Sequence, residues 1–320
     1  MLTSTRKDLI TRLQPLIALA IMVLGLSLST KNFFTSENGL IILRQISVNL
    51  CLSIGMTLVI LTAGIDLSVG AVLGLTGAIA AVLLKNGIVI QKYDLLIQFN
   101  VSGAMLAAII VGATIGCING TIITRFGVPP FIVTLGMLSA TRGMTKLWTH
   151  GDSITGLGNA FGSLGNGHWL GIPTPIWVYS VLVIIFVVIT RRTRFGRYIY
   201  AIGGSERASI LSGLPVDRTK IIAYTISGMT AAVAGLIVTS RLDSADPVAG
   251  GGYELDSIAA VVIGGTSLAG GRGSIPGTVL GCLIIGVLNS GLNQIGVPPA
   301  WQDVAKGAVI VIAVAIDRRR

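Results

Sequence analysis

The chain is divided by short polar segments into about ten apolar runs, most of them long enough to cross a bilayer as a helix of roughly 20 residues. Of its 320 residues 52% are hydrophobic and 11% charged, and the mean hydropathy is +0.84, which leaves little chain for a soluble domain. The pattern predicts an all-α fold, a polytopic helical bundle in which residues 1–320 form a single transmembrane domain. We expect spans at 14–31, 42–63, 67–85, 97–124, 128–148, 174–190, 219–240, 254–269, 274–295 and 299–316. The eighth is short and interrupted by glycine, which is typical of a re-entrant or broken helix.

Residues 191–220 form the only long polar segment that is dense in positive charge. Lysine and arginine collect in cytoplasmic loops, so this segment is predicted to lie in the cytoplasm. Both chain ends are also basic, and the net charge of +10 is therefore explained by topology rather than by binding of nucleic acid. We expect both termini in the cytoplasm, which requires an even number of spans. The basic residues of the segment are Arg191, Arg192, Arg194, Arg197, Arg207, Arg218 and Lys220.

A short helix is predicted inside this basic segment. Ser205 is placed to cap its first turn, and Glu206 puts negative charge at the positive end of the helix dipole. Gly213 suits the left-handed stop position, and Pro215 prevents continuation. A compact capped helix displayed by a membrane bundle indicates a docking element for a soluble partner.

Uncharged polar residues recur at helical spacing inside the expected spans. Since an unpaired polar group is costly in lipid, such residues turn toward protein or water. They either line a pathway for a hydroxylated substrate or hydrogen-bond between helices, and both readings stay open. The candidates are Gln45, Asn49, Ser53 and Thr57 on the second span and Asn289 and Asn293 on the ninth, with Thr225, Ser227, Thr230 and Asn119 as weaker ones.

Asp66 stands at a glycine-bounded break between two apolar runs. Either Asp66 or Ser68 caps the following helix, or Asp66 serves in gating or partner contact. Asp303 and Lys306 are spaced to pair on the last span. The external connection 149–173 either contacts a partner or is an ordinary solvated loop.

Small residues are spaced for close helix packing. Gly112, Gly116 and Gly120 form one ladder, and further pairs are Gly70 with Gly74 and Gly277 with Gly281. We expect packing within the chain, with packing against a second copy as the alternative. The cysteines Cys51, Cys117 and Cys282 each fall inside an apolar run and are expected to be buried.

Several catalytic and cofactor motifs are absent from the sequence. It has no GxxxxGK[ST] phosphate loop, no GxSxG and no HExxH, and the glycine-rich stretch 264–277 does not fit GxGxxG. The acidic residues sit in loops or near span ends, unlike the mid-membrane carboxylate of many ion-coupled carriers. We therefore expect no catalytic, cofactor or metal site, and an energy source on another polypeptide.

Three blocks resemble the permease subunits of bacterial ribose-type ABC importers: MTLVILTAGIDLSVGAVLGLTGA (56–78), TRFGRYIYAIGGSERASILSG (193–213) and GYELDSIAAVVIGGTSLAGGRGS (252–274). The resemblance covers most of the chain. It implies the ten-helix, type II importer fold, a homodimer in the bacterial inner membrane, a cytoplasmic ATP-binding subunit and a periplasmic sugar-binding protein. The implied substrate is a monosaccharide, and among the sugars that this family transports the resemblance favours D-ribose.

The resemblance also implies that a cytoplasmic coupling helix enters a cleft on the ATP-binding subunit. The second residue of the EAA-like signature differs here, so detailed contacts do not transfer. The matching positions are Gly203, Gly204, Ser205, Glu206, Arg207, Ala208, Leu211, Ser212, Gly213 and Leu214.

Two other functional classes compete with an ABC importer permease. One is a stand-alone sugar channel or secondary carrier, and the other is an intramembrane enzyme, for which the sequence shows no polar cluster at one depth.

Overall fold

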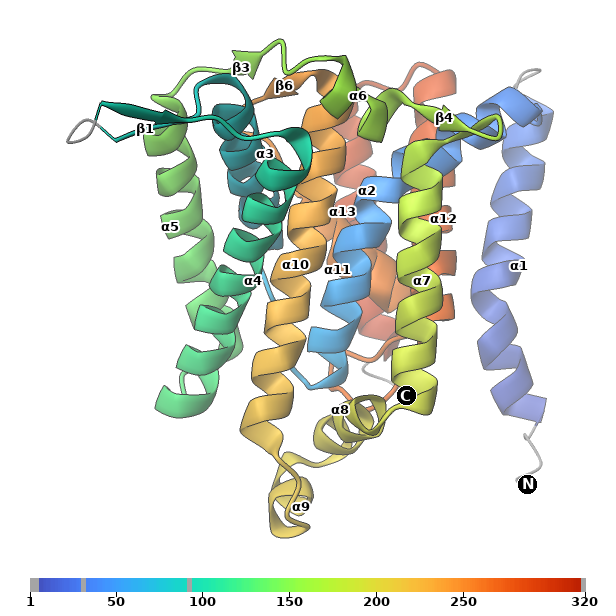
Figure 1. Ribbon diagram of the computed structural model, residues 1–320. Coiled ribbons are helices and arrows are strands. Elements are labelled where there is room, and N and C mark those ends of the chain that lie inside the picture. The colour runs from blue at the N-terminus through green and yellow to red at the C-terminus, as the bar shows by residue number, and fades with distance from the viewer. Residues whose placement is uncertain (1–5, 30–32, 91–93, 318–320) are drawn as a thin grey trace.

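The computed structural model describes residues 6–29, 33–90 and 94–317 as a bundle of helices that run between two opposite ends (Figure 1). Its short strands pair antiparallel as β1 with β2, β3 with β6 and β4 with β5. The helices are α1 (Arg6–Ser29), α2 (Ser36–Leu61), α3 (Val69–Lys85), α4 (Val101–Phe126), α5 (Pro130–Thr149), α6 (Asn159–Asn166), α7 (Thr174–Arg192), α8 (Arg194–Gly204), α9 (Glu206–Leu211), α10 (Val216–Leu242), α11 (Tyr253–Ile263), α12 (Ile275–Gln294) and α13 (Pro299–Asp317). The strands are β1 (Ile88–Ile90), β2 (Leu95–Ile97), β3 (Ile154–Thr155), β4 (His168–Trp169), β5 (Ile172–Pro173) and β6 (Ser244–Ala245).

Every expected span coincides with a helix, so the predicted all-α membrane bundle is confirmed. Within the described ranges, α2, α4, α7, α10 and α12 are long and apolar enough to cross a membrane, and α3 and the Pro15–Leu28 part of α1 are shorter apolar helices. The eighth span is broken, as expected. Helix α11 has 11 residues, which at about 1.5 Å each rise only about 16 Å, and the rest of the expected span falls in the loop 264–274.

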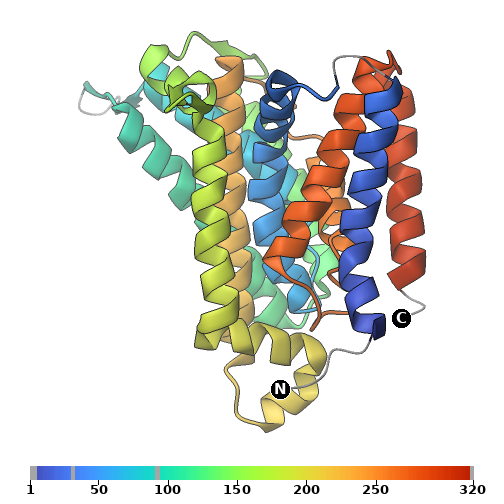
Figure 2. The same ribbon diagram turned by 90° about the vertical axis from the view of Figure 1, so that its right-hand side faces the viewer.

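Helix α1 begins and α13 ends at the end of the bundle that carries α8 and α9 (Figures 1 and 2). The opposite end carries α6 and the strands (Figure 1). This arrangement fits an even number of crossings. The basic segment contains two helices rather than the single one expected. Helix α8 was missed, although its buried Ile199 and Ile202 repeat at helical spacing.

Helix α2 lies at the centre of the bundle, and every residue from Leu50 to Leu61 is buried. Helix α10 packs against α2, α3 and α4. The outer faces of α4 and α7 expose large apolar side chains such as Leu106, Ile110, Ile184 and Val188, which suits contact with lipid.

The glycine ladders pack within the chain, as expected. Gly116 of α4 lies so close to α10 that a Cβ there would stand 2.8 Å from the Tyr224 carbonyl carbon and 3.0 Å from Thr225 Cα. Gly112 and Gly120 meet α10 in the same way. Gly70 and Gly74 face residues 249–254, while Gly277 and Gly281 face Ala260 and Gly264. These surfaces are therefore occupied and are not free for a second copy.

One cysteine prediction is wrong. Cys51 and Cys282 are buried, but Cys117 is exposed. Its neighbour Gly116 faces α10, and successive helical residues are about 100° apart, so Cys117 turns toward the outside of the bundle.

The connection 149–173 is folded, although most of its residues are exposed to solvent. Its helix α6 is fastened to the end of α10, because Gly165 N donates to Ser240 Oγ at 2.8 Å and Asn166 Nδ2 donates to Arg241 O at 3.1 Å. Strand β3 of the same connection pairs with β6. The connection 149–173 is thus packed against this end of the bundle.

Candidate transport site and coupling element

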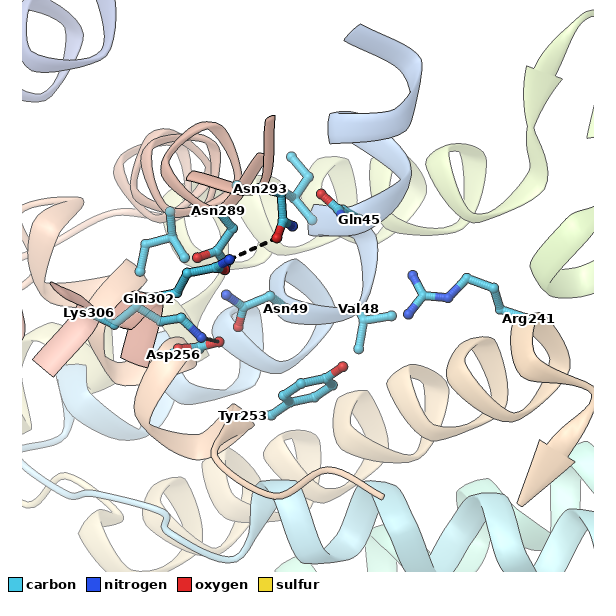
Figure 3. Close-up of a pocket in the computed structure, with 13 residues that line it drawn as sticks. Gln45, Val48, Asn49, Arg241, Tyr253, Asp256, Asn289, Asn293, Gln302 and Lys306 are labelled. Carbon is cyan, nitrogen blue, oxygen red and sulfur yellow. Dashed lines mark hydrogen bonds and ion pairs between the residues drawn. The ribbon is translucent and has the colours of Figure 1, made fainter. Parts of the chain in front are cut away.

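A cavity of about 250 Å³ lies among α2, α11, α12 and α13 and the last residues of α10 (Figure 3). It occupies the half of the bundle away from α9, because it is lined by the beginnings of α2, α11 and α13 and by the ends of α10 and α12. Nine of its 13 lining residues have polar side chains, which is unusual within an apolar bundle. The lining residues are Gln45, Ile46, Val48, Asn49, Arg241, Tyr253, Asp256, Ile285, Gly286, Asn289, Asn293, Gln302 and Lys306.

Four of the predicted pathway residues meet in this cavity. Gln45 and Asn49 are one turn apart on α2, Asn289 and Asn293 are one turn apart on α12, and both pairs line the same space (Figure 3). The Oδ1 atoms of Asn49 and Asn289 are buried and have no hydrogen-bond partner among the residues that the structure describes. A buried acceptor without a donor is costly, so these two oxygens favour a ligand that donates hydrogen bonds.

Ser53 and Thr57 continue the α2 stripe but do not line the cavity. Both are fully buried, and Ser53 Oγ donates to Ser257 O over 3.5 Å. Thr57 Oγ1 donates to Ser53 O at 2.6 Å and lies 2.7 Å from Thr278 Oγ1. In this structure Ser53 and Thr57 therefore form hydrogen bonds between α2 and the helices α11 and α12. These contacts close the cavity on the side that faces α9.

Charged residues of the cavity were not among the predicted site residues. Lys306 Nζ lies 3.6 Å from Asp256 Oδ2 and 3.2 Å from Asp303 Oδ1, so the expected pair on the last span is present but shares its lysine with α11. Gln302 Nε2 donates to Asn293 Oδ1 at 2.8 Å. Asp256 stands near the start of an expected span, where a charged residue is common and signals no function. Only the packing of α11 on α13 identifies Asp256 as a residue of the cavity.

Asp66 lies apart from the cavity, in the connection from α2 to α3, and is only 1% exposed. Its Oδ1 accepts from Ser68 N at 3.0 Å and Ser68 Oγ at 2.6 Å, and its Oδ2 accepts from Ser227 Oγ at 2.9 Å. Asn119 Nδ2 donates to Ser68 Oγ at 3.0 Å. Asp66 thus ties the start of α3 to α4 and α10, and Ser68 makes no side-chain cap of α3. The weaker candidates Thr225 and Thr230 bond to carbonyls of their own helix.

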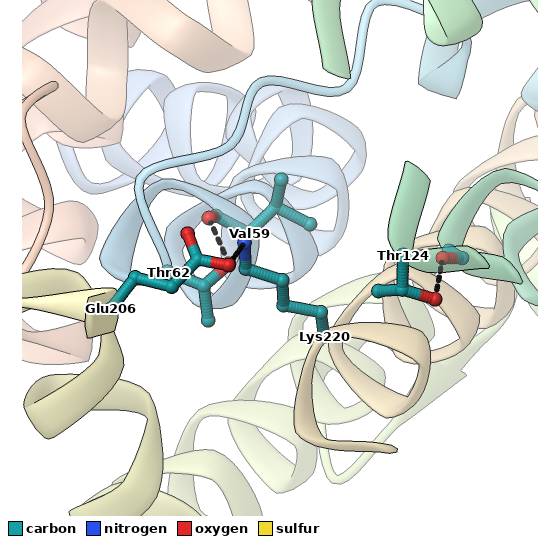
Figure 4. Close-up of polar contacts among 6 residues, drawn as sticks. Val59, Thr62, Thr124, Glu206 and Lys220 are labelled. Carbon is teal, nitrogen blue, oxygen red and sulfur yellow. Dashed lines mark hydrogen bonds and ion pairs between the residues drawn. The ribbon is translucent and has the colours of Figure 1, made fainter. Parts of the chain in front are cut away.

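The short helix predicted inside the basic segment is present as α9. Ser205 Oγ accepts from Ala208 N at 3.2 Å, and Gly213 adopts φ +74°. Glu206 Oε1 of α9 pairs with Lys220 Nζ of α10 at 2.6 Å (Figure 4). Leu211 is 82% exposed and Ile210 58%, so α9 presents two apolar side chains at the tip of the bundle. An exposed apolar patch framed by polar residues is typical of a protein-docking surface.

No group of three or more potential metal-ligating side chains occurs within residues 6–29, 33–90 and 94–317. A polar cavity inside a bundle of apolar helices is the arrangement expected of a multi-pass membrane permease.

The comparisons with known proteins agree with that class. A model of the family described as "Branched-chain amino acid transport system / permease component" matches residues 38–314, and the chain belongs to this family. The ribose import permease protein of Escherichia coli strain K12 is 47% identical over 309 residues, 95% of this chain and 93% of the relative. The ribose import permease protein of Bacillus subtilis strain 168 is 46% identical over 311 residues, 97% and 93% of the two chains. The D-allose transport system permease protein of E. coli K12 is 38% identical over 303 residues, 95% and 90%.

No solved structure matches the chain. The chain is the permease component of an ABC transporter rather than an enzyme, as expected from the sequence. A permease of this kind works with an ATP-binding subunit and a substrate-binding protein.

Proposed function

We propose that the chain imports a monosaccharide, D-ribose, across the bacterial inner membrane as one half of a homodimeric permease. A separate cytoplasmic ATP-binding subunit powers it, and a periplasmic binding protein delivers the sugar. The observation that carries the proposal is the polar cavity with its two unpartnered amide oxygens, Asn49 Oδ1 and Asn289 Oδ1.

The chemistry of the cavity suits a neutral polyol. Each sugar hydroxyl is both a donor and an acceptor, so it satisfies an amide oxygen and accepts from an amide N–H. The family description names branched-chain amino acids, but the cavity carboxylate Asp256 is already paired with Lys306 rather than free for an ammonium group. The ribose and D-allose permeases among the relatives support the same choice.

The orientation of the chain in the membrane is inferred from the positive charge around α8 and α9. Cytoplasmic loops collect arginine and lysine, so this end of the bundle, with both termini, faces the cytoplasm. The cavity then lies on the periplasmic side, and the hydrogen bonds of Ser53 and Thr57 close it toward the cytoplasm. Import requires these contacts between α2, α11 and α12 to separate once the ATP-binding subunit moves α9.

The site is tested by uptake of radiolabelled ribose into proteoliposomes that contain the permease, its ATP-binding subunit and the binding protein. Removing one hydrogen bond to the sugar costs about 0.5–1.5 kcal/mol, so Asn49→Ala and Asn289→Ala should lower uptake by about two- to tenfold. Asn86→Ala, at the exposed end of α3, is the matched control and should leave uptake unchanged. Equal uptake by all three variants would contradict the assignment of the cavity.

Docking is tested separately by purification of the complex. Leu211→Asp should reduce the amount of ATP-binding subunit that copurifies, whereas Leu170→Asp, at a position 75% exposed at the other end of the bundle, should not. The rival reading, a stand-alone channel or carrier, predicts ribose flux into vesicles that contain this chain alone and no nucleotide. That result would overturn the proposal.

A further inference from the structure

The glycine-rich loop 264–274, which fits no nucleotide-binding motif, joins α11 to α12 and reaches the end of α2 near α8. It is closed by its own hydrogen bonds, from Ser267 N to Arg272 O at 2.9 Å and from Gly270 N to Ser267 O at 3.0 Å. Gly270 and Gly271 adopt φ +88° and +70°, a region that favours glycine. The loop is therefore a compact turn with a defined shape.

This loop contacts the last residue of α2 and the last residues of α8 through backbone atoms. Gly271 N donates to Leu61 O at 3.0 Å, which satisfies a carbonyl that a helix end otherwise leaves without a partner. The Cβ position of Gly270 lies 2.9 Å from Ala63 N and 3.0 Å from Gly203 Cα. That of Gly271 lies 2.7 Å from Gly204 N.

Gly203 occupies the centre of this contact. A Cβ on Gly203 would fall well inside the van der Waals distance of both Leu61 O and Gly271 N, and neither backbone atom can rotate away. The adjacent Gly204 differs, because no described atom outside its immediate chain neighbourhood lies within 4 Å of its Cβ position. We call Leu61, Gly203, Gly270 and Gly271 the glycine junction.

A side-chain hydrogen bond ties α8 to the same loop, because Tyr200 Oη donates to Gly273 O at 3.0 Å. Burial raises the pKa of Tyr200, an effect that the charge of Arg191 partly opposes, so the phenol keeps the proton that it donates. Helix α8 is thus held to the loop at two places, one turn apart.

The glycine junction stands between the docking helix and the cavity. Ser205 alone separates α8 from α9, since its N–H donates to Ala201 O of α8 while its side chain caps α9. On the other side of the junction, α2, α11 and α12 carry Asn49, Asp256 and Asn289 of the cavity. A displacement of α9 would therefore pass through α8 to three of the helices that line the cavity.

We propose that the glycine junction and Tyr200 transmit the movement of α9 to α2, α11 and α12, and that Gly203 and Tyr200 are positioning residues for transport. The proposal rests on the proposed function, because it takes α9 as the element that the ATP-binding subunit moves. Backbone-to-backbone contact suits this task, since two chains that touch without intervening side chains move together.

The test compares Gly203→Ala with Gly136→Ala in the complete importer in proteoliposomes, and measures ribose taken up per ATP hydrolysed. Gly203→Ala wedges α8 away from α2 and should lower this ratio by about fivefold or more, because overpacking against fixed backbone displaces whole elements. Gly136→Ala, on α5 and away from the glycine junction, adds the same methyl group to open space and should match the wild type. The amount of ATP-binding subunit that copurifies should be the same for both.

Tyr200→Phe removes the second link without altering shape and should lower the ratio in the same direction, by a smaller factor. If the Gly203→Ala protein fails to reach the membrane, the Tyr200→Phe variant alone tests whether the contact between α8 and the loop is needed for transport. A ratio equal to that of the wild type in Tyr200→Phe and in any Gly203→Ala protein that assembles overturns the inference. A wild-type complex that imports no ribose refutes the proposed function instead, so the two failures are distinguishable.

Discussion

The contact between α4 and α10 allows the sharpest prediction about stability. Gly116→Ala places a methyl group 2.8 Å from the Tyr224 carbonyl carbon and 3.0 Å from Thr225 Cα. Carbon atoms in optimal contact are about 3.5–4.0 Å apart, so the two helices must separate by about 0.5–1 Å. Since both obstructing atoms belong to the backbone, no side-chain rotation relieves the clash.

The magnitude follows from two opposing effects. Replacing glycine by alanine in a helix interior contributes about 1 kcal/mol of stability, while overpacking of this kind costs about 1–3 kcal/mol. Gly136→Ala on α5 isolates the first effect, because the space around Gly136 is open in the part of the chain that the structure describes. The free energy of unfolding of Gly116→Ala should therefore be about 1–3 kcal/mol below that of Gly136→Ala.

The assay is reversible unfolding of the purified protein in mixed micelles with increasing sodium dodecyl sulfate, followed by circular dichroism. Gly112→Ala should behave like Gly116→Ala, because its Cβ position lies 2.8 Å from Ala232 Cβ on the same face of α10. If the Gly116 and Gly136 variants unfold at the same free energy, the close approach of α4 and α10 does not govern stability, and the reasoning is refuted.

Three further predictions concern single sites. Lys306→Met should destabilise the protein by up to about 3–5 kcal/mol because it leaves the partly buried Asp256 carboxylate alone, whereas Asp256→Asn should cost less because Lys306 keeps its ion pair with Asp303; the double variant should recover part of the Lys306→Met loss, and an additive double variant would contradict the pairing. Cys117 should react with a membrane-permeant maleimide in the folded protein while the other two cysteines stay unlabelled, as mass spectrometry of digested protein will show; labelling of all three would mean that the bundle is open. Ser205→Ala removes the bond to Ala208 N and should raise amide exchange in α9, at a cost of about 0.5–2 kcal/mol to that helix, without changing exchange in α10.

Helix α9 was predictable because its signals are local. Ser205 and Gly213 act within one turn of the helix that they bound, so their identities alone place its ends. The same locality made Asn49 and Asn289 recognisable as polar residues within apolar runs, because the cost of a polar group in lipid depends on the residue and its depth. Helix α8 was predictable in principle from the spacing of Ile199 and Ile202, but the density of arginine hid it.

The division of the α2 stripe was beyond sequence reasoning. Asn49 and Thr57 recur at the same spacing, yet the first lines the cavity and the second is sealed against Thr278 of α12. The side of Cys117 was missed for a related reason, since a run of apolar residues in lipid has no polar face to show which side meets protein. Asp256 and Lys306 are 50 residues apart, and nothing local to either indicates that they meet.

The sequence by itself determined the class of fold, the order of the apolar helices, the short capped helix α9 and the polar residues within apolar helices, because hydropathy, capping and charge act over one or two helical turns. The tertiary structure alone decided which polar groups share a cavity, which glycines bring α2, α8 and the α11–α12 loop into backbone contact, and where the cavity closes. Those outcomes depend on the rotation and depth at which separate helices pack, and these are set by contacts between residues far apart in the chain.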